Sequence, residues 1–207
     1  PKIAGDLFHR YYDEWKTADD LGFNIMVNEH HQTATCMSST VIVGLSVLAR
    51  ETKKARLLVL GYPIGHRPDP LRCAEELATI DVVSRGRLDM GFIKGVPYEF
   101  PASNQNPVGV MDRFWEAHDF IIKAMAMALI KVPDANVSWT DSAMVKHKHA
   151  DVGVAVSIPG GLITPVVRNA ETKPLAGISN EMKDFAERAR ARRLLPEEYQ
   201  GGSTSVS

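Results

Sequence analysis

Apolar side chains in the first 130 residues alternate between two spacings. Apolar positions that recur every three or four residues predict helices, at residues 11–18, 41–48 and 71–82. Short continuous apolar runs predict strands, at residues 23–27, 55–60 and 87–93. Because strands that alternate with helices pair in parallel through crossover connections, this part of the chain predicts an α/β fold.

Turn-forming residues mark where these elements end. Gly22 and Gly86 are placed to end the first and third helices in left-handed turns. The hydroxyl groups of residues 38–40 offer an N-cap to the second helix. Residues 61–70 are rich in Gly and Pro and predict a loop. A longer polar loop then precedes a fourth helix, which we expect to start near Asp112.

The alternation of helix and strand stops after the fourth helix, which Pro133 is expected to end. Residues 136–140 predict a short strand, with Trp139 as its core anchor. Residues 151–157 predict a buried strand, because both of its faces carry apolar or small side chains.

A turn and one charged helix complete the pattern. The Pro-Gly-Gly sequence at 159–161 turns the chain into a strand over 162–167, and Pro165 assigns that strand to an edge or a bulge. Pro174 is placed to open the last helix, whose buried face is predicted to comprise Leu175, Ile178, Met182, Phe185 and Ala189. Arginines and acidic residues share its other faces, which favours a solvated surface over a nucleic-acid patch.

Composition narrows the setting. The chain has 207 residues, 44% of them hydrophobic, and a formal net charge of −1, so nothing in the totals favours nucleic acid or a membrane surface as partner. Cys36 and Cys73 are the only cysteines, which predicts reduced thiols and a cytoplasmic location. The apolar runs are shorter than the roughly 20 residues that cross a bilayer. The first residue is Pro1, which fits either a trimmed start or a fragment.

Candidate site residues follow three consecutive predicted strands. Glu29-His30-His31 comes after the first strand, Gly61-Tyr62 after the second and Lys94-Gly95 after the third. Parallel sheets bind ligands at the C-terminal ends of their strands, so this distribution predicts a small-molecule site. The alternative is that the two histidines are surface or structural residues and that Lys94 is a solvated charge.

The histidines do not predict a metal site. Adjacent residues of an extended segment point to opposite sides, so His30 and His31 are poorly placed to share one metal ion. His147 and His149 form an H-x-H pair in a basic turn, but no third ligand lies nearby in the sequence.

Residues from about 5 to 125 resemble the luciferase-like flavin monooxygenase family. The motifs that carry the resemblance are Asp20-Leu21-Gly22-Phe23, Glu29-His30-His31, Arg67-Pro68-Asp69-Pro70-Leu71-Arg72, Glu75-Glu76-Leu77-Ala78-Thr79-Ile80-Asp81 and Ser84-Arg85-Gly86-Arg87-Leu88. The resemblance implies a partial TIM barrel over residues 1–122 and a flavin cofactor, FMN or a relative such as a deazaflavin.

The same resemblance assigns roles to the strand-end residues. It places His30 and His31 near the flavin ring and its oxygen adduct, as catalytic residues, and makes Lys94 a ligand of the flavin phosphate. Gly61 and Tyr62 fall where family members place a backbone kink against the ring. Histidine titrates in a range that suits proton transfer to oxygen, and lysine suits a phosphate as a point charge. A complete barrel takes about 250 residues, so we expect this segment to supply about half of one.

Residues from about 119 to 207 resemble the catalytic domain of the dihydrolipoamide acyltransferases of 2-oxoacid dehydrogenase complexes, of the pyruvate type. The matching motifs are Lys131-Val132-Pro133-Asp134-Ala135-Asn136-Val137-Ser138-Trp139, Asp151-Val152-Gly153-Val154-Ala155-Val156, Pro159-Gly160-Gly161-Leu162-Ile163-Thr164-Pro165 and Gln200-Gly201-Gly202-Ser203-Thr204. The resemblance implies a partial α+β segment of the chloramphenicol-acetyltransferase type over residues 123–207.

This family transfers an acyl group between lipoyl-lysine and coenzyme A. Its oxyanion-stabilising serine corresponds to Ser207, although a frayed terminal serine is the alternative. Thr164 corresponds to the substrate channel, with an ordinary edge-strand residue as the alternative. The D-H-R-x-x-D-G motif that carries the family's general base would lie beyond residue 207, and neither His147 nor His149 stands in its place.

Residues 119–126 fit both families and form the predicted seam between a monooxygenase fragment and an acetyltransferase fragment. No Gly/Ser or Pro-rich linker separates the two. We therefore expect both activities to be incomplete in the isolated chain. The alternatives are a non-catalytic fusion that associates with an acyltransferase oligomeric core, or a recombination or sequence-assembly artefact with neither activity.

Overall fold

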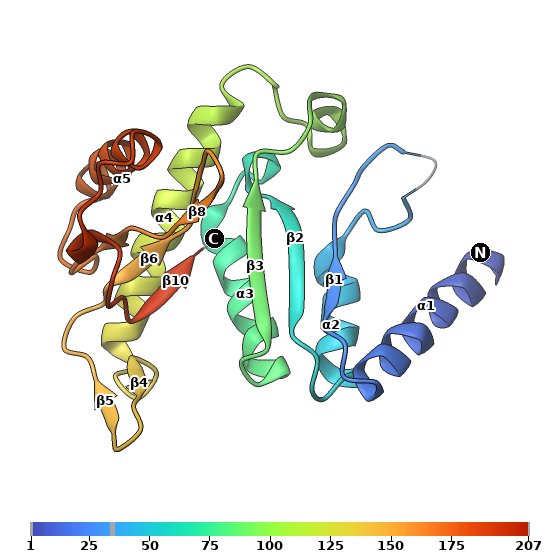
Figure 1. Cartoon of the computed structure of the whole chain (residues 1–207). Helices are drawn as coiled ribbons and strands as arrows, with labels where there is room; N and C mark the ends of the chain where they lie inside the picture. Colours follow the sequence, from blue (N-terminus) through green and yellow to red (C-terminus); the bar gives the residue numbers. More distant parts are fainter. Residues whose placement is uncertain (1, 34–35, 207) are drawn as a thin grey trace. The chain divides into compact units, whose positions relative to one another are not determined.

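Residues 2–33 and 36–206 are described by the computed structural model, and the chain divides into two units, Pro1–Met111 and Asp112–Ser207 (Figure 1). Both units contain helices and strands, which confirms the predicted mixed α/β class. The units divide before the predicted boundary at residues 122 and 123, so that nearly all of helix α4 (Val110–Lys131) belongs to the second unit.

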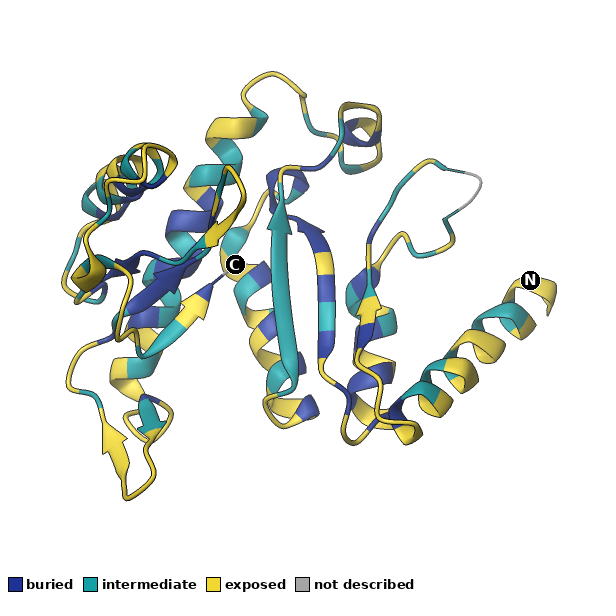
Figure 2. Ribbon diagram, viewed as in Figure 1, coloured by how far each residue is buried: buried dark blue, intermediate teal, exposed yellow. Residues whose placement is uncertain are grey.

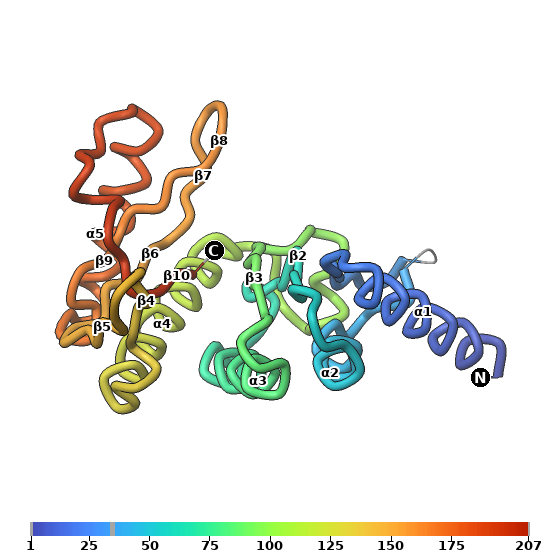
Figure 3. The backbone as a smooth tube through the Cα atoms, turned by 60° about the horizontal axis from the view of Figure 1, so that its bottom comes forward, coloured from blue at the N-terminus to red at the C-terminus, as the bar shows by residue number. Residues whose placement is uncertain are grey.

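The first unit is built on a three-stranded parallel sheet, as the alternating pattern predicts. Its strands lie in the order β1 (Ile25–Val27), β2 (Leu57–Pro63) and β3 (Leu88–Ile93). The helices between or beside them are α1 (Lys2–Asp20), α2 (Val41–Glu51) and α3 (Pro70–Ser84), with the short 3-10 helices η1 (Ile64–His66) and η2 (Pro97–Ser103). Helices α2 and α3 lie on the same side of the sheet (Figure 3).

The apolar core of this unit lies between the sheet and those two helices. Leu45 of α2, Leu57 and Val59 of β2 and Ile80 of α3 are all buried (Figure 2). Strand residues of the opposite face remain open, since Met26 is 60% exposed. One face of the sheet is therefore covered and the other is not, among the residues that the structure describes.

One local prediction for the first unit was wrong, and another was confirmed only in part. Strand β2 continues through residues expected in a loop, because Tyr62 and Pro63 pair with β3, after a register shift between Leu60 and Tyr62. The N-cap of α2 is Thr40, but no side chain of the cap residue bonds to the helix; the carboxylate Oε2 of Glu29 accepts from the N–H of Val41 at 3.0 Å instead. A buried carboxylate thus does the work that was expected of hydroxyl groups.

The second unit combines α4 with short strands and one further helix. Its sheet has the order β10 (Thr204–Val206), β6 (Val152–Val154) and β9 (Val166–Val167), with β10 parallel and β9 antiparallel to β6. Two hairpins pair β4 (Val137–Trp139) with β5 (Met144–Lys146) and β7 (Val156–Ile158) with β8 (Gly161–Ile163). Helix α5 (Leu175–Arg190) and η3 (Pro196–Glu198) complete it.

The predicted buried face of α5 is largely confirmed. Ile178, Met182, Phe185 and Ala189 are buried, and the helix contacts β7 and β9. Leu175 differs, because it starts the helix and is 44% exposed.

Other predictions for the second unit were wrong. Trp139 is 78% exposed rather than a core anchor, since β4 pairs only with β5 among the described strands. The single strand expected over 151–157 is divided at Ala155 between β6 and β7, which belong to different sheets. The returning strand is divided likewise at Thr164 and Pro165, where the carbonyl of Pro165 accepts from the N–H of Val154 at 2.8 Å.

No helix among the described residues is both long and apolar enough to cross a membrane.

Candidate functional site

The residues singled out in the first unit share one edge of its sheet. His30 and His31 follow β1, Gly61 and Tyr62 lie in the last part of β2, and Lys94 follows β3. Because all three strands are parallel, these positions are all at the C-terminal edge.

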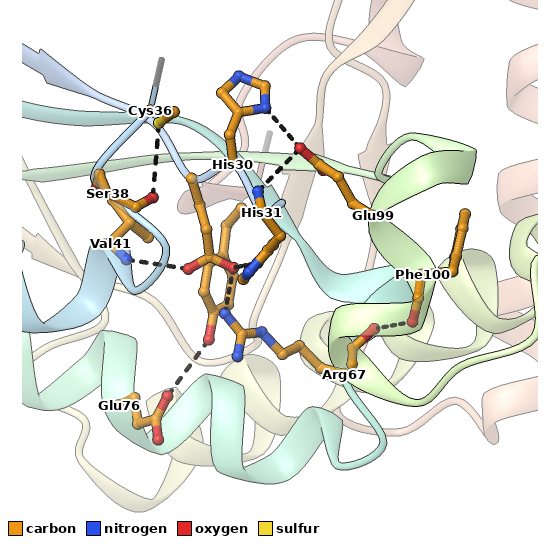
Figure 4. A network of polar contacts seen from close by, with 12 residues as sticks. His30, His31, Cys36, Ser38, Val41, Arg67, Glu76, Glu99 and Phe100 are labelled. Carbon is orange, nitrogen blue, oxygen red and sulfur yellow. Dashed lines mark hydrogen bonds and ion pairs between the residues drawn. The ribbon is translucent and has the colours of Figure 1, made fainter. Parts of the chain in front are cut away.

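Glu29 is a buried acceptor at the centre of this edge. Its side chain is 0% exposed, and its Oε1 accepts from Nε2 of His31 at 2.9 Å and from the Arg67 guanidinium at 2.5 Å (Figure 4). Its Oε2 accepts the α2 N-terminal N–H of Val41. Three donors, one of them permanently charged, replace the water that this carboxylate loses on burial.

Glu99 is a second buried carboxylate, which the sequence analysis missed. It lies in η2 and is 2% exposed. Its Oε1 accepts from the backbone N–H of His31 at 3.1 Å and from Nδ1 of His30 at 3.0 Å. An acidic residue between Tyr98 and Phe100, in a loop otherwise expected to be polar, is the signal that points to it in the sequence.

The two adjacent histidines are held in different ways. The His30 side chain is 37% exposed and contacts Glu99, whereas the His31 side chain is 17% exposed and contacts Glu29. In Figure 4 the ring of His30 lies at the outside of the network, and its second nitrogen points away from Glu99. His30 is therefore the more accessible of the pair.

His66 is a third histidine at this edge and is 1% exposed. Its ring packs on Phe100 with centroids 4.2 Å apart, and neither ring nitrogen has a hydrogen-bond partner among the described residues. Burial lowers the pKa of His66, so the ring is held neutral. A Cβ added at Gly95 would lie 1.9 Å from Nε2 of His66, so the close approach of the loop after β3 requires glycine there.

The Tyr62 side chain is buried and contacts α3. It is 0% exposed, its hydroxyl donates to Glu76 of α3 at 3.4 Å, and the Arg67 guanidinium carbon lies 5.0 Å from its ring centroid. Burial raises the pKa of Tyr62 well above its ordinary value. The peptide bond between Leu60 and Gly61 is cis. Gly61 is buried as well, whereas Lys94 is exposed.

The candidate residues of the second unit are more dispersed. Thr164 is half-buried between β8 and β9, and its methyl group lies 3.0 Å from where a Cβ on Gly153 would be. Ser207 lies outside the described residues. The Arg168 guanidinium donates hydrogen bonds to the Asp151 carboxylate at 2.8 Å and to the carbonyl of Gly201 at 3.0 Å. These hydrogen bonds hold the segment that leads into β10.

The basic turn of the second unit uses its histidines for structure. Nε2 of His147 lies 2.8 Å from the Ser138 hydroxyl, and Nδ1 of His149 lies 2.7 Å from the Glu171 carboxylate. Within residues 2–33 and 36–206, no three His, Cys, Asp or Glu side chains are grouped so that they could hold a metal ion.

Two family models match this chain. The model described as luciferase-like monooxygenase matches residues 5–127, and that described as 2-oxoacid dehydrogenases acyltransferase (catalytic domain) matches residues 113–207. Both matches include residues 113–127, which lie inside α4.

Among curated proteins, the pyruvate dehydrogenase complex dihydrolipoyllysine-residue acetyltransferase component of Rhizobium meliloti is 73% identical over 90 residues. That alignment covers 44% of this chain and 20% of the relative. A monooxygenase structure from Streptomyces bottropensis matches with a TM-score of 0.56 and 28% identity, over 59% of this chain and 38% of that one.

The oxygenating component of a Pseudomonas putida 3,6-diketocamphane monooxygenase, solved with FMN, matches with a TM-score of 0.53 at 14% identity, over 68% of this chain and 38% of that one. This chain therefore spans about a fifth of the curated relative and less than two fifths of each monooxygenase.

Proposed function

Because this chain belongs to the luciferase-like monooxygenase family through residues 5–127 and carries acyltransferase catalytic-domain sequence over residues 113–207, we propose that two unrelated enzyme fragments are joined inside α4. The helix runs unbroken from Val110 to Lys131, through the residues that both family models match. A join at a shared helical stretch preserves the apolar periodicity. We place the boundary at residues 122 and 123.

For the first fragment we propose a flavin-dependent oxidoreductase site on a partial TIM barrel. The observation that carries this proposal is the accessible His30, held by a buried carboxylate at the C-terminal edge of a parallel sheet. The exposed ammonium of Lys94 suits the phosphate of a flavin mononucleotide. We place Gly61 and Tyr62 beside the edge of its ring. The P. putida relative was solved with FMN, which supports the same choice.

When bound, the flavin would supply the redox chemistry, and the protein would supply binding and proton transfer. Lys94 would hold the phosphate, and His30 would exchange a proton with an oxygen atom at the ring. His31 faces Glu29 and Arg67, so we assign it the supporting role in the proposed catalytic pair.

Titration of the purified chain with oxidised FMN, read by flavin fluorescence, tests this site. We expect quenching that saturates, and a tenfold or greater loss of affinity in Lys94→Met, since a charged contact contributes on the order of 1.5–3 kcal/mol. Lys53→Met, at an exposed lysine after α2, is the matched control and should bind as the parent chain does. Absence of quenching, or equal binding by Lys94→Met, would refute the proposal.

For the second fragment we propose a partial dihydrolipoyllysine acetyltransferase domain of the chloramphenicol-acetyltransferase type, with lipoyl-lysine and coenzyme A as the substrates of the parent activity. The 73% identity to the R. meliloti component supports it. Thr164 would line the substrate channel and Ser207 would stabilise the oxyanion. The D-H-R-x-x-D-G motif, with its histidine, does not occur in these 207 residues. We therefore propose that these residues by themselves do not catalyse acetyl transfer between coenzyme A and dihydrolipoamide.

An assay with acetyl-coenzyme A and dihydrolipoamide decides this point, because acetyl transfer above the uncatalysed rate would contradict it. The competing non-catalytic role predicts that the chain co-sediments with an assembled acyltransferase core of the R. meliloti type.

We also propose a cytoplasmic location for this chain. Cys36 and Cys73 are both free thiols, which supports that proposal.

A further inference from the structure

The two carboxylates behind the histidine pair contact different ring nitrogens. Glu99 meets Nδ1 of His30, and Glu29 meets Nε2 of His31. Neutral imidazole carries one proton, on whichever nitrogen faces an acceptor, and leaves the other nitrogen as an acceptor. The contacts therefore carry information about where each ring holds its proton.

Both oxygens in question are already acceptors. Oε1 of Glu29 also receives the Arg67 guanidinium, which can only donate, and Oε1 of Glu99 also receives the backbone N–H of His31. The ring nitrogens that face them must then be donors. We infer that Glu99 and Glu29 fix the adjacent histidines in opposite tautomers, with the proton on Nδ1 in His30 and on Nε2 in His31.

This arrangement makes the pair unequal. His30 is the more exposed of the two rings, and its Nε2 is left as a hydrogen-bond acceptor. His31 donates its Nε2–H to the fully buried carboxylate of Glu29. Glu99 is therefore a positioning residue: it selects the basic nitrogen of His30 and turns it outward (Figure 4). A ligand O–H bond could then break with its electron pair left on oxygen, while the Nε2 lone pair takes the proton and Glu99 faces the resulting imidazolium.

The catalytic meaning of this inference rests on the proposed flavin site, but its test does not. Two-bond proton–nitrogen NMR spectra of the full chain, labelled with nitrogen-15 histidine, distinguish the protonated from the bare ring nitrogen. Spectra taken over a range of pH, with His30→Gln and His31→Gln to assign the signals, report both rings. We expect the stated tautomers to exceed the opposite ones by about tenfold or more, given the strength of a hydrogen bond to a charged acceptor.

Substitution of Glu99 separates positioning from simple stability. Glu99→Leu should release His30 towards the Nε2–H form, while Glu99→Gln should retain the original tautomer, because its amide oxygen can accept from Nδ1–H. Glu75→Leu, at an exposed site on α3, should change neither ring. If Glu99→Leu does not fold, the spectrum of the parent chain alone still tests the inference.

An Nε2–H tautomer for His30 in the parent chain, or an unchanged His30 pattern in folded Glu99→Leu, would overturn the inference. The spectra are recorded without flavin, so failure of the FMN titration leaves this result intact. Conversely, if the chain binds FMN but His30 carries its proton on Nε2, the role inferred for Glu99 is refuted and the proposed flavin site is not.

Discussion

Single buried polar side chains decide the character of the C-terminal strand edge in the first unit. His66 is the extreme case, because a nearly inaccessible imidazole has no hydrogen-bond partner for either nitrogen in the described part of the chain. The charged groups that act on it are Glu99 and Glu29, which favour the imidazolium, and His31 and Arg67, which oppose it. Burial is the largest effect and lowers the pKa of His66.

The lowered pKa predicts acid sensitivity of the folded state. Below about pH 6.5 the unfolded chain binds a proton at residue 66 that the folded chain resists, so the free energy of unfolding falls as pH decreases. We would measure the free energy of unfolding in urea for the parent chain and for His66→Leu, from about pH 8 to pH 5. As the pH decreases, this free energy should fall more steeply in the parent chain, by up to about 1.4 kcal/mol per pH unit.

His9→Leu, at an exposed position on α1, is the matched control and should keep the slope of the parent chain. Every histidine other than residue 66 is common to the parent chain and His66→Leu, so the difference between their slopes reports residue 66. Equal slopes for the parent and His66→Leu would contradict a lowered pKa at this residue.

At the scale of elements, the loop after β3 and η1 are fitted together through glycine. Gly95 has φ +83° and lies under the His66 ring, while Gly86 has φ +78° and open space around its α carbon. Alanine at either position pays for the left-handed backbone, about 1–2 kcal/mol. Only Gly95→Ala also collides with a side chain, at 1.9 Å.

Gly95→Ala should therefore destabilise the first unit more than Gly86→Ala does, by about 2 kcal/mol or more, since overpacking costs typically 1–3 kcal/mol. Urea unfolding followed by far-ultraviolet circular dichroism gives both values. Equal effects of the two substitutions would mean that the His66 ring does not rest on this loop.

In the second unit, a single lysine links α4 to a turn. The Lys123 ammonium donates to the carbonyls of Glu171 at 2.6 Å and Lys173 at 2.8 Å, and more weakly to that of Ala170. Lys123→Met keeps the aliphatic stem but leaves these carbonyls without their charged donor, so we expect about 2 kcal/mol of destabilisation in urea. Lys183→Met, on the exposed side of α5, should change stability by less than about 0.5 kcal/mol; a matching loss there would remove the special role of Lys123.

The elements show which parts of the fold the sequence could predict. The apolar periodicity of α5, the parallel order of β1 to β3 and the left-handed turns at Gly22 and Gly86 depend on residues close together in the chain, and all were predictable. The exposure of Trp139 was not, because it depends on whether another layer covers the β4–β5 hairpin.

The candidate site divides in the same way. His30 and His31 stood out because unusual residues follow a strand. Glu99 bonds to residues 68 and 69 positions earlier in the chain, a pairing that no local pattern encodes. Glu29 lay in the predicted motif, but its role as acceptor for the N-terminus of α2 depends on how β1 and α2 pack. Ser207 and its predicted role stay a prediction.

At the scale of the whole molecule, helix α4 contains the residues that both family models match. Both family models match residues 113–127, yet the units divide between Met111 and Asp112. The contacts of Lys123 with 171 and 173, and of the Thr204 hydroxyl with the Met125 sulfur at 3.7 Å, explain why α4 groups with the second unit. The residues that both family models match therefore belong to the second unit.

Separate cores predict separate energetics. The chain passes from one unit to the other once, inside α4, and substitutions without shared partners add within about 0.5 kcal/mol. Hydrogen exchange read by mass spectrometry should show that Gly95→Ala lowers protection in α2 and β2 and leaves β6 and α5 unchanged, while Lys123→Met does the reverse. The double variant should show the sum of the two losses. A loss of protection in both units from either single substitution would mean that the two units fold as one cooperative body. The same would follow if the loss of unfolding free energy in the double variant differed from the sum of the two single losses by more than about 1 kcal/mol. Either result would contradict the proposed join of two separate fragments.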